Sequence, residues 1–411
     1  MSALDRTPSN TNFLQPTKFI LAFNRLPTVQ YFCQMANLPG ATLGVAELST
    51  PLSEVPIAGS KISYNEFTKN NLPQTNINNY NIIPNVGHYI TFSDTFLGRA
   101  GVLPLNYWVL DYDSIPAVNQ FGTQVKSMLR CFEDWFGPYP FYTDGYKLIQ
   151  SPFLGMEHQS GIAYGNGFSN GYLGEDLSQT GWGYSWDYII VHESGHEWFG
   201  NNISVKDVAD NWIHEGFTCY SENLFVEYLF GKTAGSEYVL GLRSSITNKN
   251  PIIANYNINQ SPDNDIYYKG ANILHYIRQI VNSDSLWKAC LRHLNQVFKH
   301  QTVSSSQVEN EMSSFLHLDL SRFFDQYLRN STIPNIEYYV KRNTLFYRSK
   351  NTISNLILPV RFYLNSNNHS NNVPIWINAG SKWQSVKLNR NQNPVPDTNC
   401  YVQFVNYSKT L

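Results

Sequence analysis

The sequence has few cysteines and no long apolar run. Its cysteines are odd in number, widely scattered and contain no C-x-x-C pair; they are Cys33, Cys131, Cys219, Cys290 and Cys400. We therefore expect mostly free thiols, with neither a disulfide framework nor a thiolate metal site. No stretch of about 18 apolar residues is present, so we predict no membrane span.

Charge is also scarce. Charged residues make up 15% of the 411 residues, and the formal net charge is -2. So small an imbalance gives no electrostatic case for binding nucleic acid or an anionic membrane surface. The opening residues, "MSALDRTPSNTNFLQ", lack the basic-then-apolar pattern of a signal peptide. The chain as written is therefore expected in the cytoplasm, and its native compartment stays open.

Aromatic residues, by contrast, are abundant. They make up 15% of the chain, within an ordinary hydrophobic share of 42%. Bulky cores explain such a share, and polar ligands that resemble peptides or sugars are a second explanation. A chain of this length is long enough for two or three domains, each with its own core.

The hydrophobic pattern predicts β structure at both ends of the chain. Residues 1–70 contain short apolar runs separated by turn sequences such as "NLPG" and "IAGS". Residues 71–86 are rich in asparagine and proline, as linkers are, and residues 87–112 add further predicted strands. After Pro334 the apolar period is two, as in strands.

The first predicted helix lies between these regions. Apolar residues recur at spacings of three and four from Val118 to Trp135, which indicates a helix with one buried face. Gly137 and the proline that follows it end this helix. Residues 139–180 are aromatic and glycine-rich, and favour strands and loops.

Residues 185–330 are predicted to be mostly helical. One helix of this region begins at a possible Ser185 cap and closes at Gly200, and the next ends at Gly231. Three more segments with helical spacing follow: "GANILHYIRQIV", "DSLWKACLRHLNQVF" and "SRFFDQYLRN".

The strongest signal for chemistry is "IIVHESGHEWFGNNISVKDVADNWIHEGFTCY", residues 189–220. On a helix, His192 and His196 lie on one face, where two imidazoles can bind one zinc ion. Glu215, separated from His196 by eighteen residues and placed on the next predicted helix, can supply a third ligand. A fourth position left open for water is typical of a catalytic zinc site.

Glu193 follows the first histidine but points differently from the helix. It can accept a proton from a water whose pKa the metal lowers toward about 7, and pass that proton to a leaving amine. This is the H-E-x-x-H arrangement of metallopeptidases. Ten histidines in 411 residues give this pattern by chance only about 0.01 times.

Other polar residues of the stretch have less specific signals. For His214 and Glu197 we predict roles on a solvated helix face. Asp207 or Asp210 can orient a histidine ring through a hydrogen bond. An ordinary capping or surface role explains these two aspartates equally well.

Two further segments agree with a peptidase. "LGMEH", residues 154–158, resembles a G-x-M-E-N exopeptidase motif, and "YYKGANIL", residues 267–274, resembles a Y-x-K-G-A motif. With "FEDWFGPYPF" and "LSRFFDQYL", these segments resemble the zinc aminopeptidases related to alanyl and leucyl aminopeptidase. That gluzincin family includes the leukotriene-hydrolysing aminopeptidase. The resemblance covers residues 72–411.

The resemblance implies a role for each matching residue. His192, His196 and Glu215 would bind one Zn²⁺, and Glu193 would be the general base. Glu157 would bind the free α-amine of a peptide, and Gly155 and Met156 of the same motif would contact the substrate. Tyr267 would stabilise the tetrahedral oxyanion. From local sequence alone, Glu157 would be interpreted as a surface glutamate and Tyr267 as a packed tyrosine.

Two positions depart from the motif. Leu154 stands where the family has glycine, and His158 stands where it has asparagine. The sequence therefore does not determine the backbone conformation of this segment, nor the substrate selectivity that depends on it.

The resemblance also implies a multidomain α+β fold. Residues 116–333 would form a thermolysin-like, mostly helical catalytic domain, and residues 334–411 a small C-terminal β-sandwich-like domain. Residues 71–115 would be a remnant of the family's N-terminal β domain. Ahead of them, residues 1–70 would form a separate β-rich segment.

The front of the chain resembles something else. Residues 12–67, with "NLPGATLGVAELSTPLSEVPIAGSKISYNEF", are similar to tail-tube proteins of contractile-tailed bacteriophages. The simplest explanation is a chimeric reading frame. The main hypothesis is a zinc aminopeptidase acting on peptides with a free N-terminus. A phage tail structural subunit and a peptidase relative without catalytic activity are the alternatives.

Overall fold

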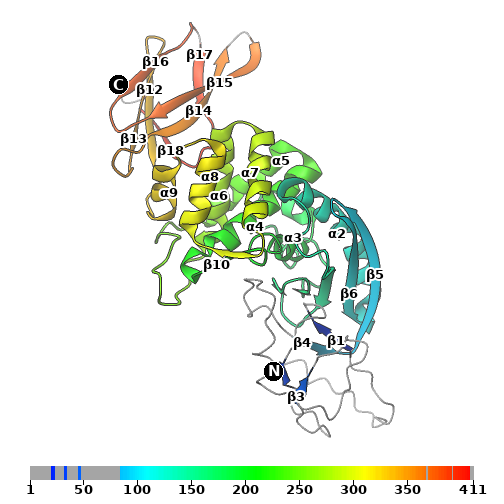
Figure 1. Ribbon diagram of the computed structural model, residues 1–411. Coiled ribbons are helices and arrows are strands. Elements are labelled where there is room, and N and C mark those ends of the chain that lie inside the picture. The colour runs from blue at the N-terminus through cyan, green and yellow to red at the C-terminus, as the bar shows by residue number, and fades with distance from the viewer. Residues whose placement is uncertain are drawn as a thin grey trace, which may run out of the picture.

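The computed structural model describes residues 20–23, 32–34, 45–47, 84–366, 369–390 and 392–407. Its described part is a multidomain α+β structure with several sheets. A long strand hairpin lies at one end, the C-terminal strands lie at the other, and the helices lie between them (Figure 1).

A five-stranded sheet precedes the site in the chain. Its strand order is β5-β6-β7-β9-β8. The strands are β5 (Tyr89–Gly98), β6 (Gly101–Leu110), β7 (Tyr146–Gln150), β8 (Gly155–Met156) and β9 (Ile162–Tyr164). β6, β7 and β9 run parallel, and β8 runs antiparallel to β9 at the edge. The motif glycine and methionine therefore form an edge strand.

Helix α2 (Ser114–Phe136) packs on this sheet because its apolar face is continuous. The ring of Phe121 lies 5.2 Å from that of Tyr107 in β6 and 4.9 Å from that of Tyr164 in β9. Gly137, with φ +95°, caps the C-terminus. The predicted helix and its stop are confirmed.

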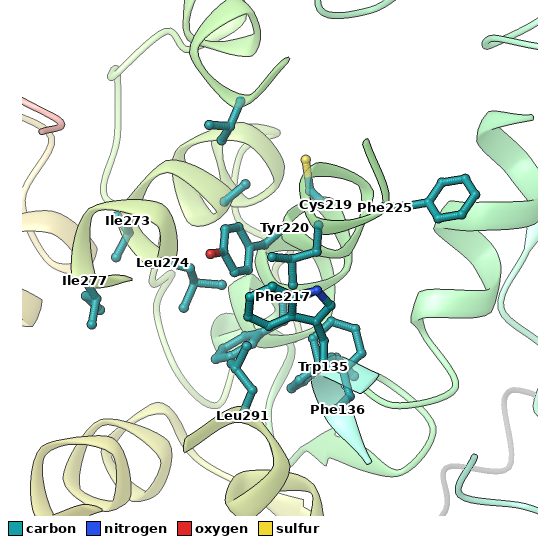
Figure 2. Close-up of a cluster of buried hydrophobic side chains, with 14 of the residues drawn as sticks. Trp135, Phe136, Phe217, Cys219, Tyr220, Phe225, Ile273, Leu274, Ile277 and Leu291 are labelled. Carbon is teal, nitrogen blue, oxygen red and sulfur yellow. The ribbon is translucent and has the colours of Figure 1, made fainter. Parts of the chain in front are cut away.

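Helices and short segments complete the middle of the chain. They are η3 (Asp111–Asp113), η4 (Trp182–Ser185), α3 (Tyr188–Gly195), β10 (Ile203–Val205), η5 (Val208–Asp210), α4 (Trp212–Phe230), α5 (Lys232–Gly241), η6 (Leu242–Ser245), α6 (Asp265–Val281), α7 (Asp284–Val297), β11 (Gln301–Val303), α8 (Ser305–Leu316) and α9 (Ser321–Leu328). Apolar side chains from α2, α4, α6 and α7 form a common core (Figure 2). Strands β10 and β11 pair in parallel.

Helices α4 and α6 meet at two glycines. A Cβ atom added at Gly270 would lie 2.6 Å from the Cα of Gly216, closer than real Cβ atoms come to other atoms. Gly216 directly follows Glu215, and Gly270 lies nearly one turn after Tyr267. This close approach therefore places the candidate oxyanion donor beside the candidate metal ligand.

The C-terminal strands form two sheets, ordered β16-β13-β12-β18 and β15-β14-β17. Their bounds are β12 (Asn335–Lys341), β13 (Thr344–Lys350), β14 (Leu358–Ser366), β15 (His369–Ala379), β16 (Gln384–Lys387), β17 (Gln392–Pro396) and β18 (Gln403–Asn406). The predicted return to strands after Pro334 is confirmed.

Three details differ from the sequence prediction. Asp187, and not Ser185, caps α3, because its carboxylate accepts from the N–H groups of Ile189 and Ile190. The helix ends at Gly195 instead of Gly200. Helices α5 and α8 were not predicted as separate elements.

Two predicted segments, residues 1–70 and the linker 71–86, lie mostly outside the described residues. Of residues 1–70 the structure describes β1 (Ile20–Phe23), β2 (Phe32–Gln34) and β3 (Val45–Glu47) alone. Most of the predicted linker 71–86 also lies outside, and its end belongs to β4 (Pro84–Gly87), which pairs with β1.

The predicted free thiols are confirmed where they are described. Four cysteines are buried and unbridged: Cys131, Cys219, Cys290 and Cys400. Cys33 lies where no side chain is described. Among the helices of the described ranges, none is long and apolar enough to cross a membrane.

The Asp187 cap generates a stability prediction. Besides its two backbone N–H groups, its buried carboxylate accepts from Tyr164 Oη at 2.7 Å, Gln120 Nε2 at 2.8 Å and Asn166 Nδ2 at 2.9 Å. We expect Asp187→Ala to lower the free energy of unfolding by more than about 3 kcal/mol, since a lost cap costs about 1 and each orphaned buried donor about 1–3.

Chemical denaturation measures this loss. The control is Asp207→Ala, which removes another capping carboxylate at a more open site and should cost less. Equal losses in the two variants would contradict the buried-network explanation.

Candidate metal centre

Three side chains from two helices meet in one place. His192 and His196 come from the end of α3, and Glu215 comes from the first turn of α4. Glu215 Oε2 lies 3.6 Å from His192 Nε2 and 3.4 Å from His196 Nε2. The candidate ligand atoms of all three lie within 4.8 Å of one another. This spacing is what a single ion bound between them requires.

The outer nitrogen of each histidine is occupied. His192 Nδ1 donates to Glu222 Oε1 at 2.7 Å, and His196 Nδ1 donates to the backbone oxygen of Phe199 at 3.0 Å. With its proton on Nδ1, a neutral ring directs the lone pair of Nε2 at Glu215. Both rings are therefore held in the tautomer that binds a metal through Nε2.

The donor set fits a zinc ion. Two imidazole nitrogens and one carboxylate oxygen are the three protein ligands of several catalytic zinc sites. Glu215 Oε2 is buried and makes no hydrogen bond within the described part of the chain. Burial alone would raise the pKa of Glu215, but the positive charge that His196 and His192 carry when protonated outweighs it and lowers that pKa. An anionic oxygen held this way suits a cation.

Glu222 is a candidate site residue that the sequence analysis missed. It is fully buried, and Tyr238 donates its hydroxyl to Glu222 Oε2 at 2.7 Å. A signal for it existed, because Glu222 lies two helical turns after Glu215 and so on the same face.

Glu193 and Glu157 face the same space as the ligands. Their carboxylate oxygens lie within 4.8 Å of each other and of a ring nitrogen of His196. Burial raises the pKa of Glu193 to about 7. A Cβ atom at Gly155 would lie 2.6 Å from Glu193 Oε1, so a larger residue here would force the Glu193 side chain to shift.

Tyr267 lies beside His192. The two rings are stacked with centroids 6.0 Å apart, on α6 and α3 respectively. Burial raises the pKa of Tyr267, and the carboxylates of Glu215 and Glu157 raise it further. The phenol therefore keeps its proton and can donate a hydrogen bond into the site.

A cavity of about 690 Å³ adjoins Glu157 and Met156. Its other walls come from the segment after the zinc helix, from the start of α4 and from a loop before α6. They include Lys206, Asp207, Asn211, His214, Asn257 and Asn259. Polar side chains outnumber the apolar Met156, Val205 and Val208 among the lining residues, but apolar atoms make up more of the lining surface.

The predictions for Glu197 and His214 were wrong. Neither lies on a solvated helix face. Glu197 is fully buried, where it accepts from Tyr139 Oη at 2.7 Å. His214 is 4% exposed, and its Nε2 accepts from the backbone N–H of Val205 at 3.0 Å. Sequence periodicity could not show these partners, because they come from other elements.

The two aspartates do not orient a histidine. Asp207 accepts from the N–H groups of Ala209 and Asn257, and Asp210 accepts from Ser305 and the hydroxyl of Tyr256. Asp207 therefore has the capping role that was the alternative explanation. Asp210 connects the start of α8 to the start of α4 through its hydrogen bond with Ser305.

This part of the chain matches known proteins. The model of the peptidase family M1 domain matches residues 123–327. Probable aminopeptidase 1 of Sulfurisphaera tokodaii is 23% identical over 306 residues, which cover 67% of this chain and 38% of that protein. The chain therefore spans well under half the length of this curated relative.

Two solved structures share the fold. Aminopeptidase A of Legionella pneumophila, in complex with aspartic acid, has a TM-score of 0.60 at 16% identity and covers 79% of this chain and 39% of its own. A mutant M1 zinc metallopeptidase from Deinococcus radiodurans, bound to a Tyr-Ser-Ala substrate, has a TM-score of 0.50 at 22% identity. That match covers 62% of this chain and 56% of the other.

The contact between Glu222 and His192 generates a prediction. We expect Glu222→Gln to weaken zinc binding about 10- to 100-fold, because a carboxylate behind a ligating imidazole fixes its tautomer and raises its basicity. Competition with a chelator measures the affinity. Glu227→Gln is the control: it lies farther along the same helix and pairs with Arg278 instead. Unchanged zinc affinity in Glu222→Gln would show that Glu222 serves packing alone.

Proposed function

Residues 123–327 match the model of the peptidase family M1 domain, and from that premise we propose that the chain is a zinc-dependent aminopeptidase. It would hydrolyse the first peptide bond of peptides that have a free N-terminus. One observation carries the proposal: His192, His196 and Glu215 converge within 4.8 Å, and the carboxylates of Glu193 and Glu157 face the same space.

Zinc would be held by His192, His196 and Glu215, and when bound it would polarise the scissile carbonyl and lower the pKa of water. The family match and the chemistry of the donor set both support this ion. Glu193 would take the proton of the attacking water on its carboxylate and deliver it to the leaving amine. Burial raises the pKa of Glu193, which favours its holding the proton between the two transfers.

Glu157 would restrict cleavage to the first residue. Its carboxylate lies beside Glu193 and can pair with the ammonium of a substrate through a charge-assisted hydrogen bond. An amine fixed there leaves room for one residue before the bond that is cut. The aminopeptidase names of the curated relative and of one structural neighbour support this restriction.

The remaining contacts would orient the substrate. Tyr267 would donate its hydroxyl to the oxygen that becomes negative as water adds. Gly155 and Met156 would lie along the peptide, since they form the edge strand next to Glu193. The cavity beside Glu157 would take the first side chain.

The domain layout belongs to the same proposal. We assign residues 116–333 to a thermolysin-like catalytic domain and residues 334–411 to a β-sandwich-like domain. Residues 71–115 would be the remnant of an N-terminal β domain. The phage-like assignment of residues 1–70 stays a prediction that mostly lies outside the described residues, as does the alternative of a tail subunit.

The role of Glu193 generates a prediction. We expect Glu193→Gln to keep zinc and to lose about 10²- to 10⁴-fold in kcat, because the amide cannot accept the proton. Metal content and rates on an aminoacyl-anilide are measured on the same preparation. Glu237→Gln, an exposed glutamate on α5, should leave both unchanged.

Two results would count against this role. Loss of zinc from Glu193→Gln would make the residue structural. A zinc-loaded wild type with no turnover would favour the inactive relative over the enzyme.

The role of Glu157 generates another prediction. An ionised carboxylate that must face a blocked amine is costly, so the wild type should reject N-acetylated substrates. We expect Glu157→Ala to lose about 2–5 kcal/mol of transition-state stabilisation on the free-amine substrate, the cost of breaking a buried charge pair, and much less on the acetylated one. The ratio of kcat/KM for the two substrates tests it.

Glu175→Ala, at an exposed glutamate, is the control and should keep the wild-type ratio. If the wild type cleaves both substrates equally, or the ratio is the same in Glu157→Ala, Glu157 is not the amine anchor.

A further inference from the structure

The segment from Glu157 to Ser160 carries the proposed amine-binding carboxylate. Its conformation is not one that its own residues favour. Ser160 has φ +55°, in the left-handed region that a serine rarely adopts. His158 is 1% exposed, and neither of its ring nitrogens has a hydrogen-bond partner in the described part of the chain. Both features cost free energy, so other elements must hold this conformation.

Glu197 holds the far end of the segment. Its Oε1 accepts from the backbone N–H of Ser160 at 2.8 Å, and its Oε2 accepts from Tyr139 Oη. On the other side of the same residue, Lys147 Nζ donates to the backbone oxygen of Ser160 at 3.2 Å. A fully buried carboxylate and a nearly buried ammonium thus hold the two backbone groups of one residue.

Asn201 holds the near end. Its Nδ2 donates to the backbone oxygen of Glu157 at 2.8 Å, and it also donates to Glu197 Oε1 at 3.3 Å. Glu197 directly follows the ligand His196, and Asn201 belongs to the turn after it. The chain that presents a metal ligand therefore also grips both ends of the segment that presents Glu157.

We propose that Glu197 and Asn201 are positioning residues that set the distance between the amine-binding carboxylate of Glu157 and the metal site. The inference rests on the proposed function. A carboxylate that must meet an ammonium one residue away from the cut bond tolerates little displacement, since a shift of about 1 Å costs up to about 100-fold in rate. Loosening the grip should weaken recognition of the free amine before it affects the metal.

The test compares two neighbouring asparagines. Asn201→Ala removes the bond to Glu157. Asn202→Ala is matched to it, because Asn202 is equally buried in the same turn but bonds to Asn295 and His300 instead. KM and kcat for an aminoacyl-anilide, the kcat/KM ratio to its N-acetyl form, and zinc content are measured for both.

We expect Asn201→Ala to raise KM about tenfold and to lower the free-amine preference, with zinc retained and kcat within about threefold. Asn202→Ala should lower the thermal stability but keep the wild-type KM and preference. Equal effects of the two variants on KM and preference, or none in Asn201→Ala, would overturn the inference and leave the proposed function intact.

Glu197 supplies a second comparison. Glu197→Gln can still accept from Ser160 through its amide oxygen and can donate to the hydroxyl oxygen of Tyr139, so KM should stay near wild type. Glu197→Ala removes both bonds and should raise KM at least as much as Asn201→Ala. A Glu197→Ala protein that folds with wild-type KM would overturn the role of Glu197, and if it does not fold, the asparagine pair decides.

Failure of the proposed function is visible in the wild type. A zinc-loaded wild type that cleaves no aminoacyl-anilide would overturn the function and this inference together. An active wild type keeps the two questions separate.

Discussion

The burial of several carboxylates around two imidazoles is the constraint on which the rest of the site depends. A buried charge is tolerated only when it is paired or well hydrogen-bonded. Each glutamate meets this requirement differently: Glu222 accepts from His192, Glu197 accepts from backbone and a phenol, and Glu215 is oriented toward a position for a cation. Glu193 meets it by a raised pKa. The cost of burying a carboxylate is therefore met in four ways: by the proposed ligand, by two supporting residues and by the proposed proton acceptor.

Helix packing converts these local solutions into one geometry. The sheet and α2 fix the edge strand that crosses Glu193, and the hydrophobic core fixes α4 against α6. The side chains that would meet the substrate in the proposed function thus come from elements far apart in the chain, while the contacts behind them are short and buried. Peptide hydrolysis needs such rigidity, because its groups act on one carbonyl from several directions.

Much of this arrangement could be predicted from local patterns. The apolar period and glycine stops predicted α2 and α4, and the spacing of the histidines and Glu215 predicted that these three side chains meet. The capping box of Ser304 and Gln307 could have located α8. Glu197 could not be interpreted correctly, since its partners Tyr139 and Ser160 lie 58 and 37 residues away. Asp187, and not Ser185, is the cap because its carboxylate reaches the N–H groups of Ile189 and Ile190, and the distant donors that also hold it were invisible to local patterns.

The contact of Gly216 with Gly270 has a consequence for how such a sequence can change. Each glycine is already the smallest residue, so neither can shrink to accommodate a larger neighbour. A replacement at either position has no compensating partner, and it would separate the helices that carry Glu215 and Tyr267. Substitution is therefore disfavoured at both glycines of this crossing. Random mutagenesis should recover substitutions there far less often than at the exposed faces of the same two helices.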